Sequence, residues 1–509
     1  MIYGNARLWL GGRAFTPGTL VVEDGVIRAI ERAGARADID LGGACVVPGL
    51  IDAHFHLQQT GAALRTVQLA GAGSEEDAAA LIATAAAALP ADSWVIGGAW
   101  DDNLWPQRRL PTLASVRAVA QPMVMTRVDF HAVWVNAEAL ARAGITRDTP
   151  DPVGGRIVRD ASGEPTGVLV DAACDLVSKH IPLERTETLE QDVRLALRRC
   201  ARVGLTCVHD MMMSPEVLRI LQSLEAAGEL TLRVRAYMFG AQPEVDELLR
   251  HPASSDRLRV VGRKLFADGA LGSRGAALRA PYSDDPSTSG LLMMSQEELT
   301  AAAARAHALG RQVAIHAIGD RAAELAATAI VEAQGAPADR RHRIEHAQTL
   351  TPSLFEVFAK AGIIASMQPS HCTCDLGWAV ARLGPARIQG AYAWRSFLDA
   401  GVRLALGSDA PIASENPWDG IRSAVVRTDG HGATLTPEQR LTLEEALAGY
   451  TSGAAFAAHD GGLGELAPGK LADFVVLDRD PFAVEVEDLA KVGTLRTVVG
   501  GVTVFEQDA

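Results

Sequence analysis

Eight short apolar runs alternate with alanine- and leucine-rich segments through the middle of this 509-residue chain. Each run has the length and composition of a buried strand, and most of the segments between them have the pattern of a helix. Strands that alternate with helices form parallel sheets, and eight such units in a row predict an α/β fold of the (β/α)8 TIM-barrel type. The candidate strands are 45–57, 205–211, 232–239, 258–267, 312–317, 342–347, 363–368 and 402–407.

The two ends of the chain have a different pattern from the middle. Short strands separated by Gly-Gly and Asp-Gly turns fill most of the first 45 residues, and similar strands recur after about residue 468. We therefore expect residues 1–47 and 460–509 to form one small β-sandwich domain, and residues 48–459 to form the barrel domain. The long gap between the first two candidate strands, about 58–204, predicts a subdomain inserted into the barrel.

Charge and cysteine usage exclude several kinds of partner. The net charge of −14 argues against a nucleic-acid backbone or an anionic membrane as the main partner. No apolar run approaches the length of a membrane-spanning helix, and residues 1–12 lack the basic start and apolar core of a signal peptide. The six cysteines include no C-x-x-C pair, as expected in a reducing compartment. These features predict a cytoplasmic protein.

Metal-binding residue types occur where the candidate strands end. His54 and His56 are two apart on the first strand, so they point to one face and can bind one metal ion, although two surface histidines would give the same pattern. His316 and His346 lie at the ends of the fifth and sixth strands, and Asp409 follows the eighth. Taken singly, these three could be hydrogen-bonded core histidines and a turn cap. Together, all five at the catalytic rim of one barrel favour a metal site.

The fourth candidate strand carries a lysine on the face that would line the barrel. Lys264 lies in the stretch VVGRKLFADGALGSR, and a buried ammonium group is costly unless it is neutralised or paired. Burial and nearby cations lower the pKa of a lysine and favour the neutral amine. An ammonium has no lone pair for a metal, but a neutral amine can add carbon dioxide. The resulting carbamate has two oxygens that could bridge two cations.

These residues lie in motifs that resemble the amidohydrolase superfamily of metal-dependent hydrolases. The resemblance is to the branch called amidohydrolase 3, which includes N-substituted formamide deformylases and is similar to N-acyl amino acid deacylases. It covers essentially the whole chain in the correct order. The matching stretches are PGLIDAHFHL, KLFADGALGSR, AIHAIGDRA, RIEHAQ and GSDAPI, and, outside the barrel core, GGAWDDNLWP, DFHAVWVN, GGRIVRD, GEPTGVL and PGKLADFVVLDRDP.

The resemblance implies a complete set of metal ligands. Lys264, as its carbamate, would bridge two ions, and Asp409 would bind the first ion and shuttle protons. Zinc is the expected metal, with one or two ions per chain, although iron, manganese or nickel could occupy such a site. A homodimer is the assembly that the resemblance suggests. The implied ligands are His54, His56 and Asp409 for the first ion, His316 and His346 for the second, and Lys264 between them.

Other side chains are candidates for contacts with the substrate, and each has a structural alternative. Arg274 could hold a substrate carboxylate or carbonyl, or it could form an ion pair with Asp268 or Asp285. Trp100 could form an apolar wall of the pocket, or it could pack in a core. The candidate donors to a carbonyl oxyanion, which could equally be loop histidines without a role, are His131, His209 and His371.

The leading hypothesis is a metal-dependent hydrolase that cleaves the C–N bond of a small amide, such as an N-formyl or N-acyl amine. A single-metal deaminase is an alternative, but such enzymes do not need a lysine on the fourth strand. Ester or lactone hydrolysis would use the same machinery as amide hydrolysis. A non-catalytic binding protein derived from the fold is a third class, and it typically loses metal ligands. Here all six ligand positions are filled.

Overall fold

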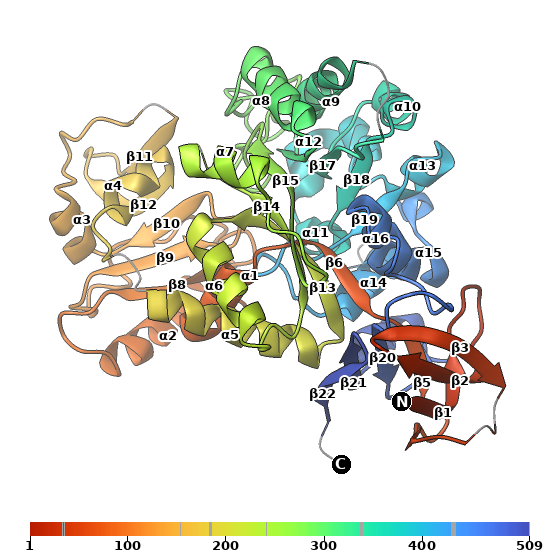
Figure 1. Ribbon diagram of the computed structural model, residues 1–509. Helices are drawn as coiled ribbons and strands as arrows, with labels where there is room; N and C mark the ends of the chain where they lie inside the picture. The colour runs from red at the N-terminus through yellow and green to blue at the C-terminus, as the bar shows by residue number, and fades with distance from the viewer. Residues whose placement is uncertain are drawn as a thin grey trace.

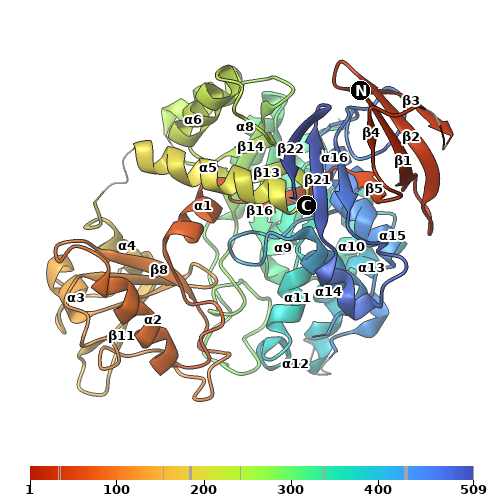
Figure 2. The ribbon, with the colours of Figure 1, turned by 90° about the horizontal axis from the view of Figure 1, so that it is seen from below.

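The computed structural model places a central barrel between two smaller sheets. It describes residues 1–507 except 33, 35, 153, 183–185, 241, 336–338 and 429–433. The insertion lies on one side of the barrel, and the sheet formed by the two chain ends lies on the other (Figures 1 and 2). No helix in the described ranges is long and apolar enough to cross a membrane.

Eight parallel strands form the barrel in their order along the chain. Each of the seven adjacent pairs is parallel, and the first and last strands meet through a bridge between Phe55 and Ala410. The backbone N–H of Asp409 also donates to the carbonyl of His54 at 2.7 Å across this seam. The strands are β6 (Leu50–Phe55), β13 (Leu205–Met213), β14 (Arg233–Met238), β15 (Leu258–Phe266), β16 (Gln312–Ala317), β17 (Arg343–His346), β18 (Ile364–Met367) and β19 (Leu404–Leu406).

Helices surround the barrel strands, and their starts follow from local sequence. Ser295 and Glu298 form a capping box at the start of α8 (Gln296–Ala308), which satisfies two of its free backbone N–H groups. The other helices of this layer are α1 (Leu57–Arg65), α5 (Thr186–Arg202), α6 (Pro215–Ala226), α7 (Pro243–Arg250), α9 (Asp320–Gln334), α10 (Pro352–Ala361), α11 (Pro369–Asp375), α12 (Ala379–Arg387), α13 (Trp394–Asp399), α14 (Pro417–Val426), α15 (Leu443–Ala448) and α16 (Ala454–Ala457).

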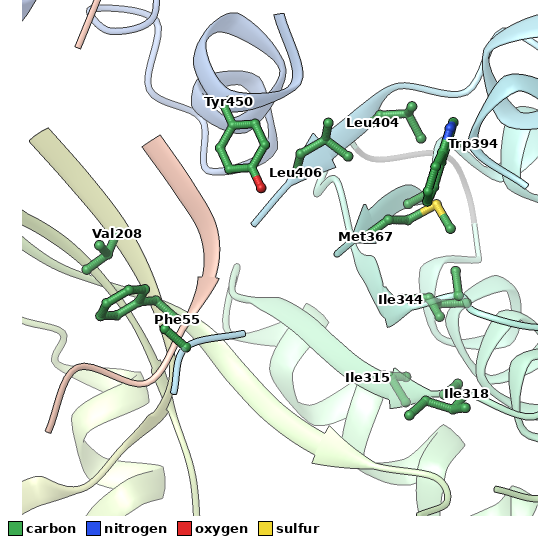
Figure 3. Close-up of a cluster of buried hydrophobic side chains, with 14 of the residues drawn as sticks. Phe55, Val208, Ile315, Ile318, Ile344, Met367, Trp394, Leu404, Leu406 and Tyr450 are labelled. Atoms are coloured by element: carbon green, nitrogen blue, oxygen red, sulfur yellow. The ribbon is translucent and has the colours of Figure 1, made fainter. Parts of the chain in front are cut away.

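The largest hydrophobic core joins the barrel strands to these helices. Leu299 on α8, Ile330 on α9 and Leu354 on α10 belong to the same buried cluster as the strands' apolar side chains. Burial of this apolar surface is the main force that holds the barrel closed. Figure 3 shows members of the cluster on six strands, namely Phe55, Val208, Ile315, Ile344, Met367 and Leu406.

Between β6 and β13 the chain forms a second, six-stranded sheet with its own buried clusters. Its strand order is β11-β12-β10-β9-β8-β7, and it ends where α5 returns to the barrel. The boundaries expected for this insertion stay a prediction. Its elements are β7 (Val67–Gln68), α2 (Glu75–Ala87), β8 (Val95–Trp100), β9 (Met123–Arg127), β10 (Ala132–Val135), α3 (Ala137–Ala143), β11 (Gly155–Arg159), β12 (Pro165–Asp171) and α4 (Asp175–Ser178).

The two ends of the chain share one mixed, eight-stranded sheet, as the red and blue strands in Figure 2 show. The link between the ends is the antiparallel pair β5–β20. The expected two-layer sandwich and the domain limits at 47 and 460 stay predictions. The strands are β1 (Ile2–Leu8), β2 (Thr16–Glu23), β3 (Val26–Arg32), β4 (Ile39–Asp40), β5 (Cys45–Pro48), β20 (Phe474–Leu477), β21 (Thr494–Val499) and β22 (Val502–Glu506).

The single strand expected over 45–57 is wrong, because the structure contains two strands there. β5 pairs with β1 and β20 in the terminal sheet, whereas β6 pairs with β13 in the barrel. Gly49 separates them, and a Cβ at this position would lie 2.2 Å from Oγ1 of the buried Thr206. The chain therefore passes from one sheet to the other at a point where only a glycine fits.

Candidate metal centre

Three buried side chains from the carboxyl ends of different strands converge at one end of the barrel. His54 lies near the end of β6, His346 is the last residue of β17, and Asp409 follows β19. Their candidate ligand atoms all lie within 4.8 Å of one another. Imidazole nitrogens and a carboxylate at such spacing are a suitable donor set for zinc and similar ions. The barrel thus brings His54 together with two residues, His346 and Asp409, that lie 292 and 355 positions further along the chain.

Asp409 is the carboxylate at the middle of this cluster. Its Oδ1 lies 2.9 Å from Nε2 of His56 and 3.3 Å from Nε2 of His54. Burial alone would raise the pKa of Asp409, but the neighbouring histidines, His54 above all, hold it well below its usual range. Both Asp409 (φ 62°) and His346 (φ 69°) have left-handed backbone conformations, which are strained for such residues. Strain of this kind is often concentrated at functional sites.

Hydrogen bonds from neighbouring side chains orient the rings of two histidines, His54 and His346. Each bond uses Nδ1 and leaves Nε2 of the same ring available for a ligand. Nδ1 of His54 lies 2.7 Å from Oε2 of Glu345, and Nδ1 of His346 lies 2.8 Å from Oε1 of Gln368. Among the described residues, Nε2 of His54 and Nδ1 of His56 are buried atoms without a hydrogen bond. Such atoms are costly unless a ligand engages them, so the residues fit a bound cation.

His316 and Lys264 lie beside this cluster. The ring centroids of His316 and His346 are 4.5 Å apart, and Nε2 of His316 contacts the carbonyl of Gly269 at 3.4 Å. Lys264 is 2% exposed, and its Nζ lies 4.7 Å above the ring of Phe266, which in turn is 5.0 Å from the ring of His316. Burial lowers the pKa of Lys264 to about 8. A substantial fraction of the amine is therefore neutral near physiological pH.

The structure thus brings all six expected ligands to one region but groups them unequally. Three form the compact cluster, and His56 contacts that cluster through Asp409. His316 contacts the cluster through the ring of His346. Lys264 lies next to His316, with the ring of Phe266 in contact with both. The assignment of each residue to a first or second ion stays a prediction.

His209 lies in the barrel interior rather than in a loop at the rim. It is fully buried, and Nη1 of Arg343 lies 2.9 Å from its Nδ1. Burial and the charge of Arg343 hold the pKa of His209 well below its usual value, so the ring is neutral. Its Nε2 makes no hydrogen bond to a described residue. The donor role expected for His209 stays a prediction.

The other two candidate donor histidines come from different parts of the chain, His371 from α11 and His131 from the insertion. His371 stacks on His346 with ring centroids 5.9 Å apart, and its Nε2 lies 3.7 Å from Oδ2 of Asp409. His131 belongs to the insertion, where its Nδ1 lies 2.8 Å from Oδ1 of Asp171. A Cβ on Gly269 would lie 3.0 Å from His131, so the insertion reaches the loop after β15. Since Nε2 of His371 is 3.7 Å from Asp409, one water molecule could bridge His371 to the cluster.

Arg274 forms an ion pair that the sequence did not reveal. Its guanidinium binds the neighbouring loop residue Asp284, with Nη2 and Oδ2 3.0 Å apart, and the expected pairing with Asp268 or Asp285 is wrong. Asp268 instead accepts three backbone N–H groups, and Asp285 accepts from Ser287. These contacts give both carboxylates partners other than Arg274. The role of Arg274 toward a substrate stays a prediction.

Trp100 lies in the core of the insertion. Its side chain is fully buried, and its indole N–H donates to the carbonyl of Met125 at 2.8 Å. The guanidinium of Arg127 covers the ring at 5.7 Å from its centroid. These contacts match the packing alternative, and a contact between Trp100 and a substrate stays a prediction.

The pair formed by His131 and Asp171 predicts a pH-dependent stability. Burial lowers the pKa of His131. Its hydrogen bond to Asp171 and the charge of Asp129 raise the pKa by more than burial lowers it, so the net shift is upward. A raised histidine pKa stabilises the fold fully below about pH 6.5, and this contribution is lost as the pH rises through the folded-state pKa. We expect Asp171→Asn to lower the free energy of unfolding more at about pH 6 than at about pH 9. Urea denaturation at both values tests this, with exposed Asp148→Asn as the control; equal losses would contradict it.

An eight-stranded parallel barrel with buried histidine and carboxylate side chains at its strand ends defines a metal-binding α/β-barrel protein. The sequence model of the Amidohydrolase family matches residues 38–505, and the chain belongs to this family. The putative amidohydrolase YtcJ of Bacillus subtilis is 34% identical to it, over 98% of this chain and 99% of that protein. The N-substituted formamide deformylase of Arthrobacter pascens is 30% identical, over 92% of this chain and 90% of that protein.

A solved structure also resembles the whole chain. It is that of an uncharacterised metal-dependent hydrolase from Pyrococcus horikoshii, which is 30% identical and covers 96% of this chain and 99% of its own. The two superpose with a TM-score of 0.78. The family and this likeness confirm the sequence-based assignment to the amidohydrolases.

Proposed function

We propose that this amidohydrolase cleaves an amide-type C–N bond of a small molecule, such as an N-formyl or N-acyl amine, with the help of zinc. The observation that carries the proposal is the buried cluster of His54, His346 and Asp409 at the carboxyl ends of the barrel strands. The likeness to an N-substituted formamide deformylase supports an amide as the substrate. We further propose that one or two ions bind, and that Lys264 is carboxylated when two are present.

The chemistry divides between the ion and the side chains. A divalent cation bound here would supply Lewis acidity, which lowers the pKa of a coordinated water and polarises a carbonyl. Asp409 accepts the water's proton and delivers it to the departing nitrogen, as its low pKa keeps it a carboxylate beforehand. Glu345 and Gln368 hold the rings of His54 and His346 in place. His371, whose Nε2 lies 3.7 Å from Oδ2 of Asp409, would donate to the carbonyl oxygen of a substrate.

Other reactions would use parts of the same site. Hydrolysis of an ester or lactone would need the same residues. A single-metal deaminase would leave Lys264 without a function, although this lysine lies buried beside the cluster. A binding protein without activity would gain nothing from a buried carboxylate that is held ionised among histidines. These arguments favour hydrolysis, and the likeness to an N-substituted formamide deformylase favours a small amide over an ester or lactone.

Elemental analysis of protein purified without chelators, in buffer that contains bicarbonate, tests the proposal first. We expect about two zinc ions per chain, and a chelator should remove both the metal and the hydrolysis of formamides and N-acyl amines. One ion per chain would leave hydrolysis possible, but it would contradict the bridging role of Lys264 and strengthen the deaminase alternative. Absence of metal even after reconstitution with zinc would contradict the enzyme hypothesis.

A further inference from the structure

A buried arginine connects the metal-binding cluster to the interior of the barrel. Arg343 and Glu345 are fully buried on β17, and Nε of Arg343 lies 2.5 Å from Oε1 of Glu345. The same guanidinium donates to the hydroxyl of Ser366 on β18 at 2.6 Å and lies 2.9 Å from Nδ1 of His209 on β13. It also donates to the carbonyl of Ala53 on β6. Its Nη1 also donates to the hydroxyl of Tyr237 on β14 at 3.3 Å. One side chain thus links five of the eight strands.

We propose that Arg343 and Glu345 are positioning residues that set the ring orientation and ligand strength of His54. Glu345 directs Oε2 at Nδ1 of His54, at 2.7 Å, so Nδ1 carries the proton and Nε2 faces the cluster. A carboxylate that accepts from a histidine raises the basicity of the opposite nitrogen, which strengthens its bond to a cation. The inference rests on the proposed metal centre, but it assigns a function to residues that touch neither ion nor substrate.

Arg343 holds His54 at two points. Its hydrogen bond to the carbonyl of Ala53 fixes the backbone immediately before His54, and its ion pair with Glu345 fixes the carboxylate that orients the ring. A buried carboxylate without such a partner would be too costly to remain ionised. The whole arrangement is therefore built to keep one charged acceptor next to one histidine.

A comparison with His346 shows why the charge of Glu345 matters for His54. His346 is oriented by the neutral amide of Gln368, whereas His54 is oriented by a charged carboxylate. A neutral acceptor fixes a ring but adds less electron density to the opposite nitrogen than a carboxylate does. His54 is therefore the stronger ligand, and loss of the charge of Glu345 should weaken metal binding even where the hydrogen bond persists.

Glu345→Gln tests this directly, because it keeps the shape and an acceptor but removes the charge. We expect the dissociation constant for zinc, measured by chelator competition, to rise about 10- to 100-fold. The matched control is Asp473→Asn, which removes the charge from another buried pair, with Arg233 and Asp473 2.7 Å apart and 3% and 2% exposed. Its zinc affinity should stay within about threefold of the wild type.

An unchanged affinity in Glu345→Gln, or an equal loss in Asp473→Asn, would overturn the positioning role. If Glu345→Gln does not fold, the double variant Arg343→Met with Glu345→Leu removes both charges and should show the same loss of affinity. A structure of the zinc-loaded wild type gives an independent check, since an ion on Nδ1 of His54 would also overturn the proposal. These readouts need no substrate, so failure to hydrolyse amides would refute the proposed function alone. A wild type that binds no zinc would refute both.

Discussion

Replacement of Asp409 by asparagine should lower kcat about 10²- to 10⁴-fold while most of the metal is retained. The amide oxygen of asparagine can still face a cation from the same position, but it cannot take up a proton and deliver it to the departing nitrogen. Asp409 lies 2.9 Å from His56 and 3.3 Å from His54. The substitution removes the negative charge between these histidines but leaves the histidines themselves to bind the metal. Metal per chain and kcat on an N-formyl amine should therefore change by very different factors.

The control for this prediction is a carboxylate at the other end of the barrel. Asp460 pairs with Arg259, the second residue of β15, at 2.8 Å, and Asp460→Asn removes an equivalent charge without touching the cluster. We expect Asp460→Asn to lower the stability but to leave kcat within about twofold of the wild type. If Asp409→Asn kept more than a tenth of the wild-type kcat, Asp409 would not be the proton shuttle.

The barrel was predictable because its strands are buried on both faces and so are visible as apolar runs. The prediction of 312–317 coincides with β16, and that of 258–267 extends one residue beyond β15. The run at 45–57 misled because both of its halves are apolar, and only the contact of Gly49 with Thr206 divides them. Gly49 and Thr206 are far apart in the sequence, so the hydrophobic pattern around Gly49 cannot predict their contact.

The expected ligands were predictable for a related reason. In a parallel barrel all carboxyl ends face one way, so residues at strand ends converge whatever their separation along the chain. The partners of those ligands were missed. Strand alternation places Arg343 and Glu345 on one face of a buried strand, which signals an internal ion pair, but it does not reveal that Glu345 meets His54 across 291 residues. Arg274 was paired wrongly because Asp268, Asp284 and Asp285 all lie within reach in sequence, and only the loop geometry selects Asp284.

Replacement of Lys264 by alanine should remove at least one metal ion per chain and lower kcat/KM by about a thousandfold or more. Lys264 is 2% exposed, and burial lowers its pKa to about 8, so about a tenth of the amine is neutral at pH 7 and free to react with carbon dioxide. The carbamate would supply two anionic oxygens beside His316 and the cluster. Alanine offers no oxygen, and the space it leaves is too apolar, next to Phe266, to hold a cation by itself.

Two further variants separate the carbamate from simple loss of a lysine. Lys264→Glu places a permanent carboxylate on the same strand and should recover part of the second metal, whereas Lys264→Met should behave like Lys264→Ala. Lys360→Ala removes an exposed lysine that pairs with Glu356 and should change neither metal content nor kcat/KM. Wild-type protein depleted of bicarbonate at low pH should lose the second metal and regain it when bicarbonate and zinc are restored, because carbamates revert to amine and carbon dioxide in acid. Full activity of Lys264→Ala with its metal retained would show that this lysine is a buried structural residue and that the site operates without a bridge.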